Sequence, residues 1–154
     1  EEMLETALRS LRWLAEIQTS EDVRFEPIGT EGFFHRDRAR ADFDQQAIEA
    51  ASMVLAALSA FAITDDAFWR KAAHTAFGWF IGANRLAVPL ADVETGGCRD
   101  GLHPDRANEN QGAESTLAYL LALLAMRCAE EGDCRAERPI VGLVSLEGRS
   151  GNGI

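Results

Sequence analysis

The feature that most constrains the fold of this chain is a helical segment that occurs twice. Residues 46–58 (QAIEAASMVLAAL) align with residues 111–123 (QGAESTLAYLLAL), and five of the thirteen positions are identical. Both copies carry Gln-x-x-Glu in the first turn and are apolar on nearly every side after it. A helix that is apolar all round has to be surrounded by protein. The repeat therefore predicts two inner helices in equivalent surroundings.

Two further segments have the periodicity of helices with a single apolar face. We expect outer helices at about residues 3–17 and 65–81, and inner helices at about residues 44–61 and 111–126. The outer segments also resemble each other, with Trp13 and Trp79 in matching places. The order outer, inner, outer, inner predicts an all-α fold made of repeated α/α hairpins.

Long loops precede both inner helices, at residues 19–43 and 84–110, whereas residues 62–64 form a short connection after the first inner helix. Loops of that length in a small domain are commonly functional. Both should lie at the N-terminal ends of the inner helices, where free N–H groups and the positive ends of the helix dipoles are found. We therefore expect a loop-walled hollow with a polar rim at that end.

Composition and charge exclude several classes of protein. The net charge of −10 and the pI near 4.7 exclude a nucleic-acid-binding surface, which would need a basic face. The longest apolar run, residues 117–126, is too short to cross a bilayer, and no signal peptide is recognisable. The cysteines lack metal-site spacing, and phosphate-loop, dinucleotide and metalloprotease motifs are absent. We expect a cytoplasmic protein with no nucleic-acid or membrane partner, no metal and no cofactor.

The chain divides into one helical domain, expected at residues 1–130, and a tail at residues 131–154. The tail is partly irregular, rich in Gly and Ser near its end, with a candidate short strand around residues 140–146. We assign the tail no function.

Polar residues gather in the loops that lead into the inner helices. Carboxylates and amides in such numbers suit a polyol, because they can hold vicinal hydroxyl groups. The candidate catalytic residues are the acids and the histidine that face the expected hollow: Asp44, Glu49, Asp100, His103 and Glu109. The candidate substrate-binding residues are the neighbouring hydrogen-bonding groups: Gln45, Gln46, Arg99, Asn110, Gln111 and Glu114.

Structural roles compete with these assignments. Asp42-x-x-Gln45 and Asn108-x-x-Gln111 both match a capping-box pattern, which would explain them by helix initiation alone. Glu49 and Glu114 lie a turn inside apolar helices, so ion pairs with Arg99 or Arg106 are the alternative to ligand contact. Cys98 is a poor nucleophile candidate, since its acidic loop would not favour the thiolate.

The segments FDQQAIEA (43–50) and ETGGCRDGLHPDRANENQGAESTLAYLLALL (94–124) resemble a domain found in or beside bacterial group 1-type glycosyltransferases. That domain is an α/α toroid, distantly like six-hairpin glycosidases and N-acylglucosamine 2-epimerases. The resemblance covers roughly residues 1–130. It implies a sugar cleft walled by Asp44, Gln45, Gln46 and Glu49 on one side and by residues 99–114 on the other.

One departure from the resemblance is large, because a closed toroid of that kind holds more hairpins than the two found here. The chain is expected either to belong to a longer protein or to complete its core by self-association. Four functions stay open: sugar binding with glycosyl transfer, hydrolysis by two carboxylates, epimerisation with His103 as proton shuttle, and a non-catalytic helical module.

Overall fold

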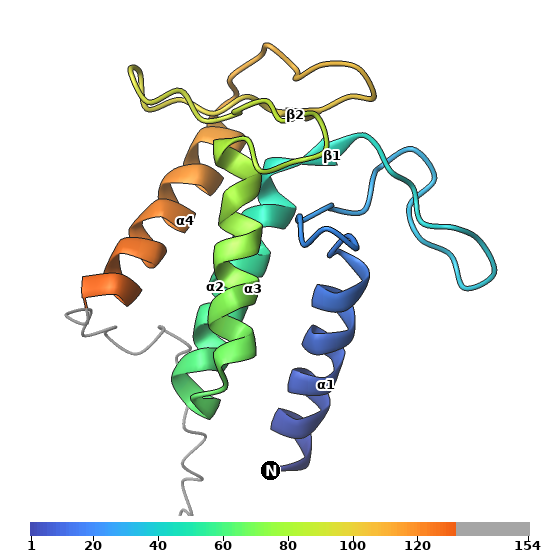
Figure 1. Ribbon diagram of the computed structural model, residues 1–154, viewed down its shortest axis with the longest axis vertical. Coiled ribbons are helices and arrows are strands. Elements are labelled where there is room, and N and C mark those ends of the chain that lie inside the picture. The colour runs from blue at the N-terminus through green and yellow to red at the C-terminus, as the bar shows by residue number, and fades with distance from the viewer. Residues whose placement is uncertain (132–154) are drawn as a thin grey trace, which may run out of the picture.

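The computed structural model describes residues 1–131, so the tail with its predicted strand lies outside the described residues. The described part is mostly helical, which confirms the all-α class (Figure 1). Its elements, in chain order, are α1 (Glu2–Ile17), β1 (Gln45–Gln46), α2 (Ala47–Thr64), α3 (Ala67–Gly78), the 3-10 turn η1 (Trp79–Ile81), β2 (Gly101–Leu102) and α4 (Ala113–Glu131).

The helix boundaries differ from the predicted ones by a few residues, each for a local reason. The first inner helix begins at Ala47 rather than at residue 44, because the two residues before it are used in β1. Helix α2 runs on to Thr64 and ends where Asp65 adopts a left-handed φ of 55°. Helix α3 begins after Asp66, whose carboxylate caps it by accepting from the Phe68 N–H at 2.9 Å.

Both long loops lie at one end of the molecule, as expected. In Figure 1 they gather where α2 and α4 begin, while the short connection from α2 to α3 lies at the opposite end. Strands β1 and β2 join the two loops as an antiparallel pair, with Gln45 opposite Leu102 and Gln46 opposite Gly101. The start of α2 is thereby fastened to the loop that leads into α4.

Helix α2 packs against both α3 and α4, and it is the central helix of the described fold. Alanines on its buried faces let the neighbouring helices approach closely. The burial of α2 recurs in α4 at the spacing of the sequence repeat. Four pairs of equivalent positions are buried in both helices: Ala50 and Ser115, Met53 and Ala118, Val54 and Tyr119, and Ala57 and Ala122.

The described residues do not enclose helix α4 on all sides. Helix α4 packs on α2 by one face and leaves a row of leucines exposed on the other. The row consists of Leu117, Leu120, Leu121 and Leu124, which are between 42% and 60% exposed. No described element covers this face.

Helix α2 has the length and composition of a membrane span, with a mean hydropathy of 1.8 over residues Ala47–Thr64. This is weak evidence for a membrane segment, because core helices of soluble proteins have the same character. Part of α2, 39% of the span, is buried inside the fold by its packing against α3 and α4.

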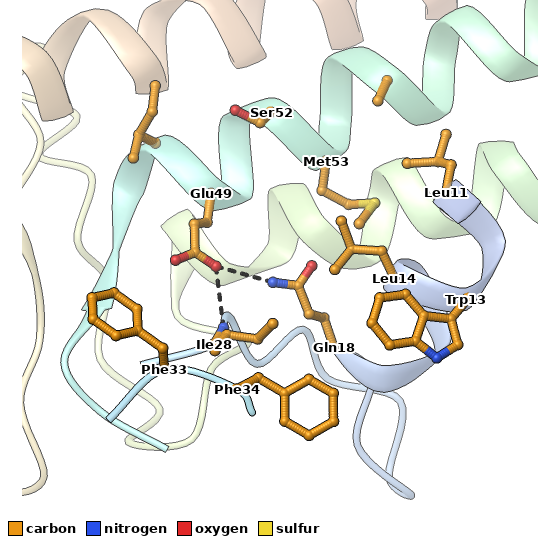
Figure 2. A pocket seen from close by; sticks show the side chains of 12 residues that line it. Leu11, Trp13, Leu14, Gln18, Ile28, Phe33, Phe34, Glu49, Ser52 and Met53 are labelled. Carbon is orange, nitrogen blue, oxygen red and sulfur yellow. Dashed lines mark hydrogen bonds between the residues drawn. The ribbon is translucent and has the colours of Figure 1, made fainter. Parts of the chain in front are cut away.

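Helix α1 stands apart from the other three and makes few contacts with α2. Arg12 holds it to the start of α3 through an ion pair with Asp66 at 2.6 Å and through its guanidinium over the Phe68 ring, 3.9 Å from the ring centre. A groove remains between α1, α2 and the first loop, as Figure 2 shows.

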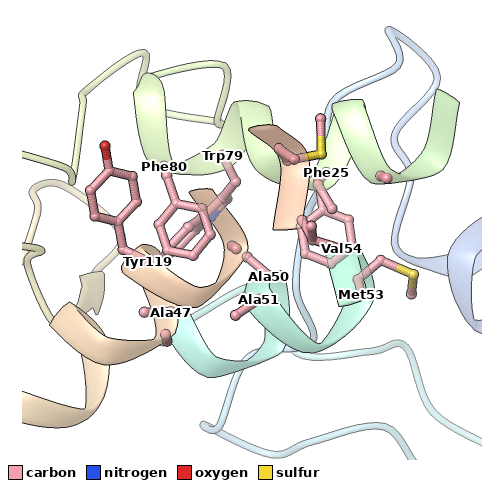
Figure 3. Packing of buried hydrophobic residues seen from close by; sticks show 14 of the residues in the cluster. Phe25, Ala47, Ala50, Ala51, Met53, Val54, Trp79, Phe80 and Tyr119 are labelled. Atoms are coloured by element: carbon pink, nitrogen blue, oxygen red, sulfur yellow. The ribbon is translucent and has the colours of Figure 1, made fainter. Parts of the chain in front are cut away.

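The main core lies between α2, η1 and α4 (Figure 3). Trp79 and Phe80 are fully buried and pack edge to face with ring centres 5.3 Å apart. Tyr119 of α4 completes the aromatic cluster, 5.5 Å from Phe80 between ring centres. This cluster sits directly beneath the polar end of the molecule, where it supports the start of α2.

Candidate functional site

A polar cleft of about 430 Å³ opens where α2 and α4 begin. Its walls come from the first loop, from both strands and from the first turns of the two inner helices. The predicted site residues that line it are Asp44, Gln45, Gln46, Asp100, His103 and Glu114. Three further polar residues also line it: Thr30, Asn108 and Ser115. The cleft therefore lies at the end of the molecule that the sequence repeat predicts. The loops supply most of its polar groups.

Asp44 and His103 contact each other in the cleft. Asp44 precedes β1 and His103 follows β2, so both lie at the same end of the antiparallel pair, and the Nδ1 atom of His103 lies 2.6 Å from Oδ1 of Asp44. Because a carboxylate can only accept, this contact places the proton on Nδ1 and leaves Nε2 as the nitrogen able to accept one. Both side chains are half-buried, so the ring is held in one orientation yet remains within reach of a ligand.

Gln45 has a structural partner, although its residue lines the cleft. The side chain is 1% exposed, accepts a hydrogen bond from the Trp79 indole N–H at 2.8 Å and donates to the Asp42 carbonyl at 3.0 Å. The amide is therefore fully engaged within the protein. Gln46, the next residue, is exposed and lines the cleft on the opposite side of the strand.

Asp100 anchors the start of α4. Its carboxylate accepts the Gly112 N–H at 2.7 Å, the Ser115 hydroxyl and the Asn110 side-chain amide. The Ser115 hydrogen bond is the largest cause that holds the pKa of Asp100 below its ordinary value of 3.8. Asp100 thus caps the N-terminus of α4, although it lies thirteen residues before the helix begins.

The two capping boxes predicted from the sequence do not form. Helix α2 has no side-chain cap, because Gln45 is turned into the core towards Trp79. At α4, Asn108 accepts from the Asn110 N–H within the loop, and Asp100 takes the place of the expected cap. The residues predicted to cap the helices lie close to the helix ends, but they make other hydrogen bonds there.

Glu49 does not reach the cleft, so the expectation that Glu49 and Glu114 share one hollow does not hold. Glu49 lies in the groove beside α1, where its Oε2 atom accepts from Gln18 Nε2 at 3.0 Å and from the Ile28 N–H at 3.1 Å. Burial raises the pKa of Glu49 above its ordinary value of 4.5, against the effect of these two hydrogen bonds.

Four other predicted residues lie near the cleft without lining it: Arg99, Glu109, Asn110 and Gln111. Asn110 binds Asp100, and Gln111 turns towards the loop at Asp92. Gln46 and Gln111 nevertheless lie at the same end of the molecule, as the repeat requires.

Thr30 and Ser115 line the cleft although neither was among the residues predicted from the sequence. Ser115 carried a signal that could have been used, since it is a polar residue one turn inside an otherwise apolar helix. Thr30 carried none. It reaches the cleft because Gly29 packs so tightly on Phe43 that a Cβ atom would lie 2.1 Å from the Phe43 carbonyl oxygen. The N–H of Thr30 then bonds to the Asp44 carbonyl at 3.0 Å.

Arginine does not seal the cleft in the part of the chain that is described. Arg106 pairs with Asp105 in an exposed contact of 2.8 Å, and Glu114 has no ion pair among residues 1–131. Cys98 is buried, and burial raises the pKa of its thiol to about 12, so it is unsuited to act as a nucleophile. Over the same residues no group of His, Cys, Asp and Glu side chains is placed to hold a metal ion.

No protein-family model matches the chain, and no curated protein sequence matches it.

Proposed function

We propose that this chain is a carbohydrate-active domain of the α/α-toroid type, part of a glycosyltransferase-related protein, and that the polar cleft binds the sugar. The observation that carries the proposal is one cavity of about 430 Å³ in which an imidazole, a free carboxylate and an exposed amide converge. Small-molecule sites commonly have volumes of roughly 300–1,000 Å³. Polar groups at the mouth of apolar helices need partners, and the hydroxyl groups of a sugar would provide them.

Each cleft side chain has a role under this proposal. Glu114 and Gln46 would accept and donate hydrogen bonds to ring hydroxyl groups. His103 would act on a hydroxyl through Nε2, because Asp44 already holds its Nδ1. In glycosyl transfer, Nε2 takes the proton of the attacking hydroxyl as general base, while Asp44 stabilises the imidazolium that forms.

Sugar binding and transfer rank ahead of hydrolysis for a specific reason. Hydrolysis by the usual route needs one carboxylic acid to protonate the leaving oxygen and a second carboxylate as base or nucleophile. Asp100 accepts three hydrogen bonds and has a lowered pKa, so it is poorly suited to donate a proton. Of the other candidate acids, Asp44 is bonded to His103, Glu109 does not line the cleft, and Glu49 lies in a different cavity.

The competing proposal is a non-catalytic helical module whose carboxylates are closed by arginine. Under it, Glu114 would be paired with Arg99 or Arg106. Arg106 pairs with Asp105, and Glu114 has no ion pair among residues 1–131, which favours an open site instead.

Binding is tested by calorimetry and saturation-transfer NMR with free hexoses and N-acetylhexosamines. At least one sugar is expected to bind, and Glu114→Gln and His103→Gln should each weaken it about tenfold or more, which corresponds to about 1.4 kcal/mol. Asp105→Asn, an exposed change in the same loop, is the matched control and should bind normally. Absence of binding to every sugar, or equal binding by the cleft variants, would reject the proposal.

A further inference from the structure

The groove between α1 and α2 is a second cavity, separate from the polar cleft. Its volume is about 540 Å³, and its walls come from α1, from the first loop and from one face of α2. The two cavities share no lining residue. The groove is mainly apolar, with Leu11, Leu14, Ile48 and Met53 along its length.

Three aromatic side chains stand around the groove (Figure 2). Trp13 and Phe34 stack with an interplanar angle of 22° and ring centres 6.2 Å apart, and Phe33 lies on the other side of Phe34. Trp13 is 54% exposed and Phe33 is 60% exposed, which is unusual for rings of this size. Phe33 also has a left-handed φ of 53°, a strained conformation that points its side chain at the groove.

One carboxylate faces this apolar and aromatic surface. Glu49 is half-buried, and hydrogen bonds from Gln18 and Ile28 fix its Oε2 atom, while Figure 2 shows Oε1 without a bond to the residues drawn. Among residues 1–131 no ion pair reaches Glu49. A positioned anion with apolar surroundings and no counter-ion is costly, and a cation would relieve that cost.

We propose that this groove binds a small organic cation, a protonated or quaternary amine with an aromatic or branched aliphatic body. The carboxylate of Glu49 receives the ammonium group, the faces of Trp13, Phe33 and Phe34 attract its positive charge, and the apolar walls cover the body. The proposal stands apart from the sugar cleft, since no residue is common to the two sites.

Cation binding in the groove is tested with two probes, phenethylamine and benzyltrimethylammonium. Phenethyl alcohol, the neutral isostere of phenethylamine, is the comparison. Titrations followed by ¹H–¹⁵N NMR at constant ionic strength should show millimolar or tighter binding of both cations, with shifts at residues of the groove. The alcohol should bind at least about tenfold more weakly.

Substitutions distinguish binding at the groove from a general attraction of cations to an acidic chain. Glu49→Gln keeps the shape and an acceptor for Gln18 and should cut amine affinity about tenfold. Trp13→Ala should cut it severalfold. Glu16→Gln removes an exposed charge from α1, the helix that carries Trp13, and should leave the amine affinity unchanged. Thermal melting confirms that each variant is folded.

Three outcomes overturn the proposal. Equal affinity for the amine and the alcohol would mean an apolar groove without preference for a cation. Unchanged amine affinity in Glu49→Gln would mean that the charge acts from elsewhere. Self-association that occludes the groove, seen by sedimentation and abolished by Ile48→Glu, would assign the groove to a second copy of the chain.

Discussion

The indole N–H of Trp79 donates a hydrogen bond of 2.8 Å to the side-chain oxygen of Gln45, and both residues are almost completely buried. This bond joins the end of α3 to the strand that starts α2. It fixes the backbone of Gln45, whose neighbours Asp44 and Gln46 face the cleft. Gln45, which the sequence predicts to bind substrate, therefore supports the site from within the core.

Gln45→Leu should lower the free energy of unfolding by about 1–3 kcal/mol, because the buried indole N–H of Trp79 loses its acceptor. Chemical denaturation measures the change. Gln46→Leu is the matched control, since Gln46 is exposed and should change stability little. In a Trp79→Phe background the cost of Gln45→Leu should shrink, because the orphaned donor is gone. An unchanged cost there would contradict the assigned role.

Asp100→Asn should loosen the start of α4. Asparagine presents an NH₂ group where the carboxylate accepts from Gly112, Ser115 and Asn110, so at least one donor loses its partner. We expect a loss of about 1–2 kcal/mol in unfolding free energy and faster amide exchange at residues 112–115. Asp105→Asn in the same loop should do neither. Unchanged exchange at Gly112 in Asp100→Asn would contradict this view.

The stability that the Asp100 carboxylate contributes should also depend on pH in the acid range. The pKa of Asp100 in the folded protein is lowered, chiefly by Ser115, from an ordinary value of 3.8. The folded state therefore binds fewer protons than the unfolded state as the pH falls below about 3.8. The stability that Asp100 contributes is present above that pH and is lost as the pH falls through the folded pKa. Melting curves should show a shallower acid loss in Asp100→Asn than in the wild type.

The backbone approach between the two loops leaves no room at Gly101. A Cβ atom there would lie 2.2 Å from the Gln45 carbonyl oxygen, which is backbone and cannot move aside cheaply. Gly101→Ala should separate β1 from β2 and abolish the contact between Asp44 and His103, seen as a change in the imidazole NMR signals. Gly96→Asn is the control, because asparagine tolerates its φ of +76° and nothing lies within 4 Å.

The helices and the polar end of the molecule could be predicted because both depend on local pattern. Apolar periodicity locates α1 to α4, and loop length places residues 19–43 and 84–110 at one end. The apolar composition of α4 says that its leucine face needs cover, but it does not say what supplies that cover, and no element of residues 1–131 does.

The separation of Glu49 from Glu114 has a geometric cause. Residues at equivalent positions of two packed helices face the neighbours of their own helix, and these neighbours differ between α2 and α4. Glu114 of α4 faces the start of α2, whereas Glu49 of α2 faces α1 and the first loop. Matching residues therefore occupy successive cavities and not a shared one. Sequence pattern finds such a pair, but only the order of the helices in space assigns each member to its cavity.

Glu49→Gln should stabilise the protein at neutral pH, the reverse of what loss of a hydrogen-bonded carboxylate usually does. Burial raises the folded-state pKa of Glu49 above 4.5, so the folded state binds more protons than the unfolded state between that value and the raised one. Stability from the neutral acid is complete below about pH 4.5 and is lost as the pH rises through the folded pKa. Glutamine resembles the neutral acid at every pH. The Tm advantage of Glu49→Gln should therefore be largest at neutral pH and vanish near pH 4, and an advantage that grows with acidity would refute the assignment.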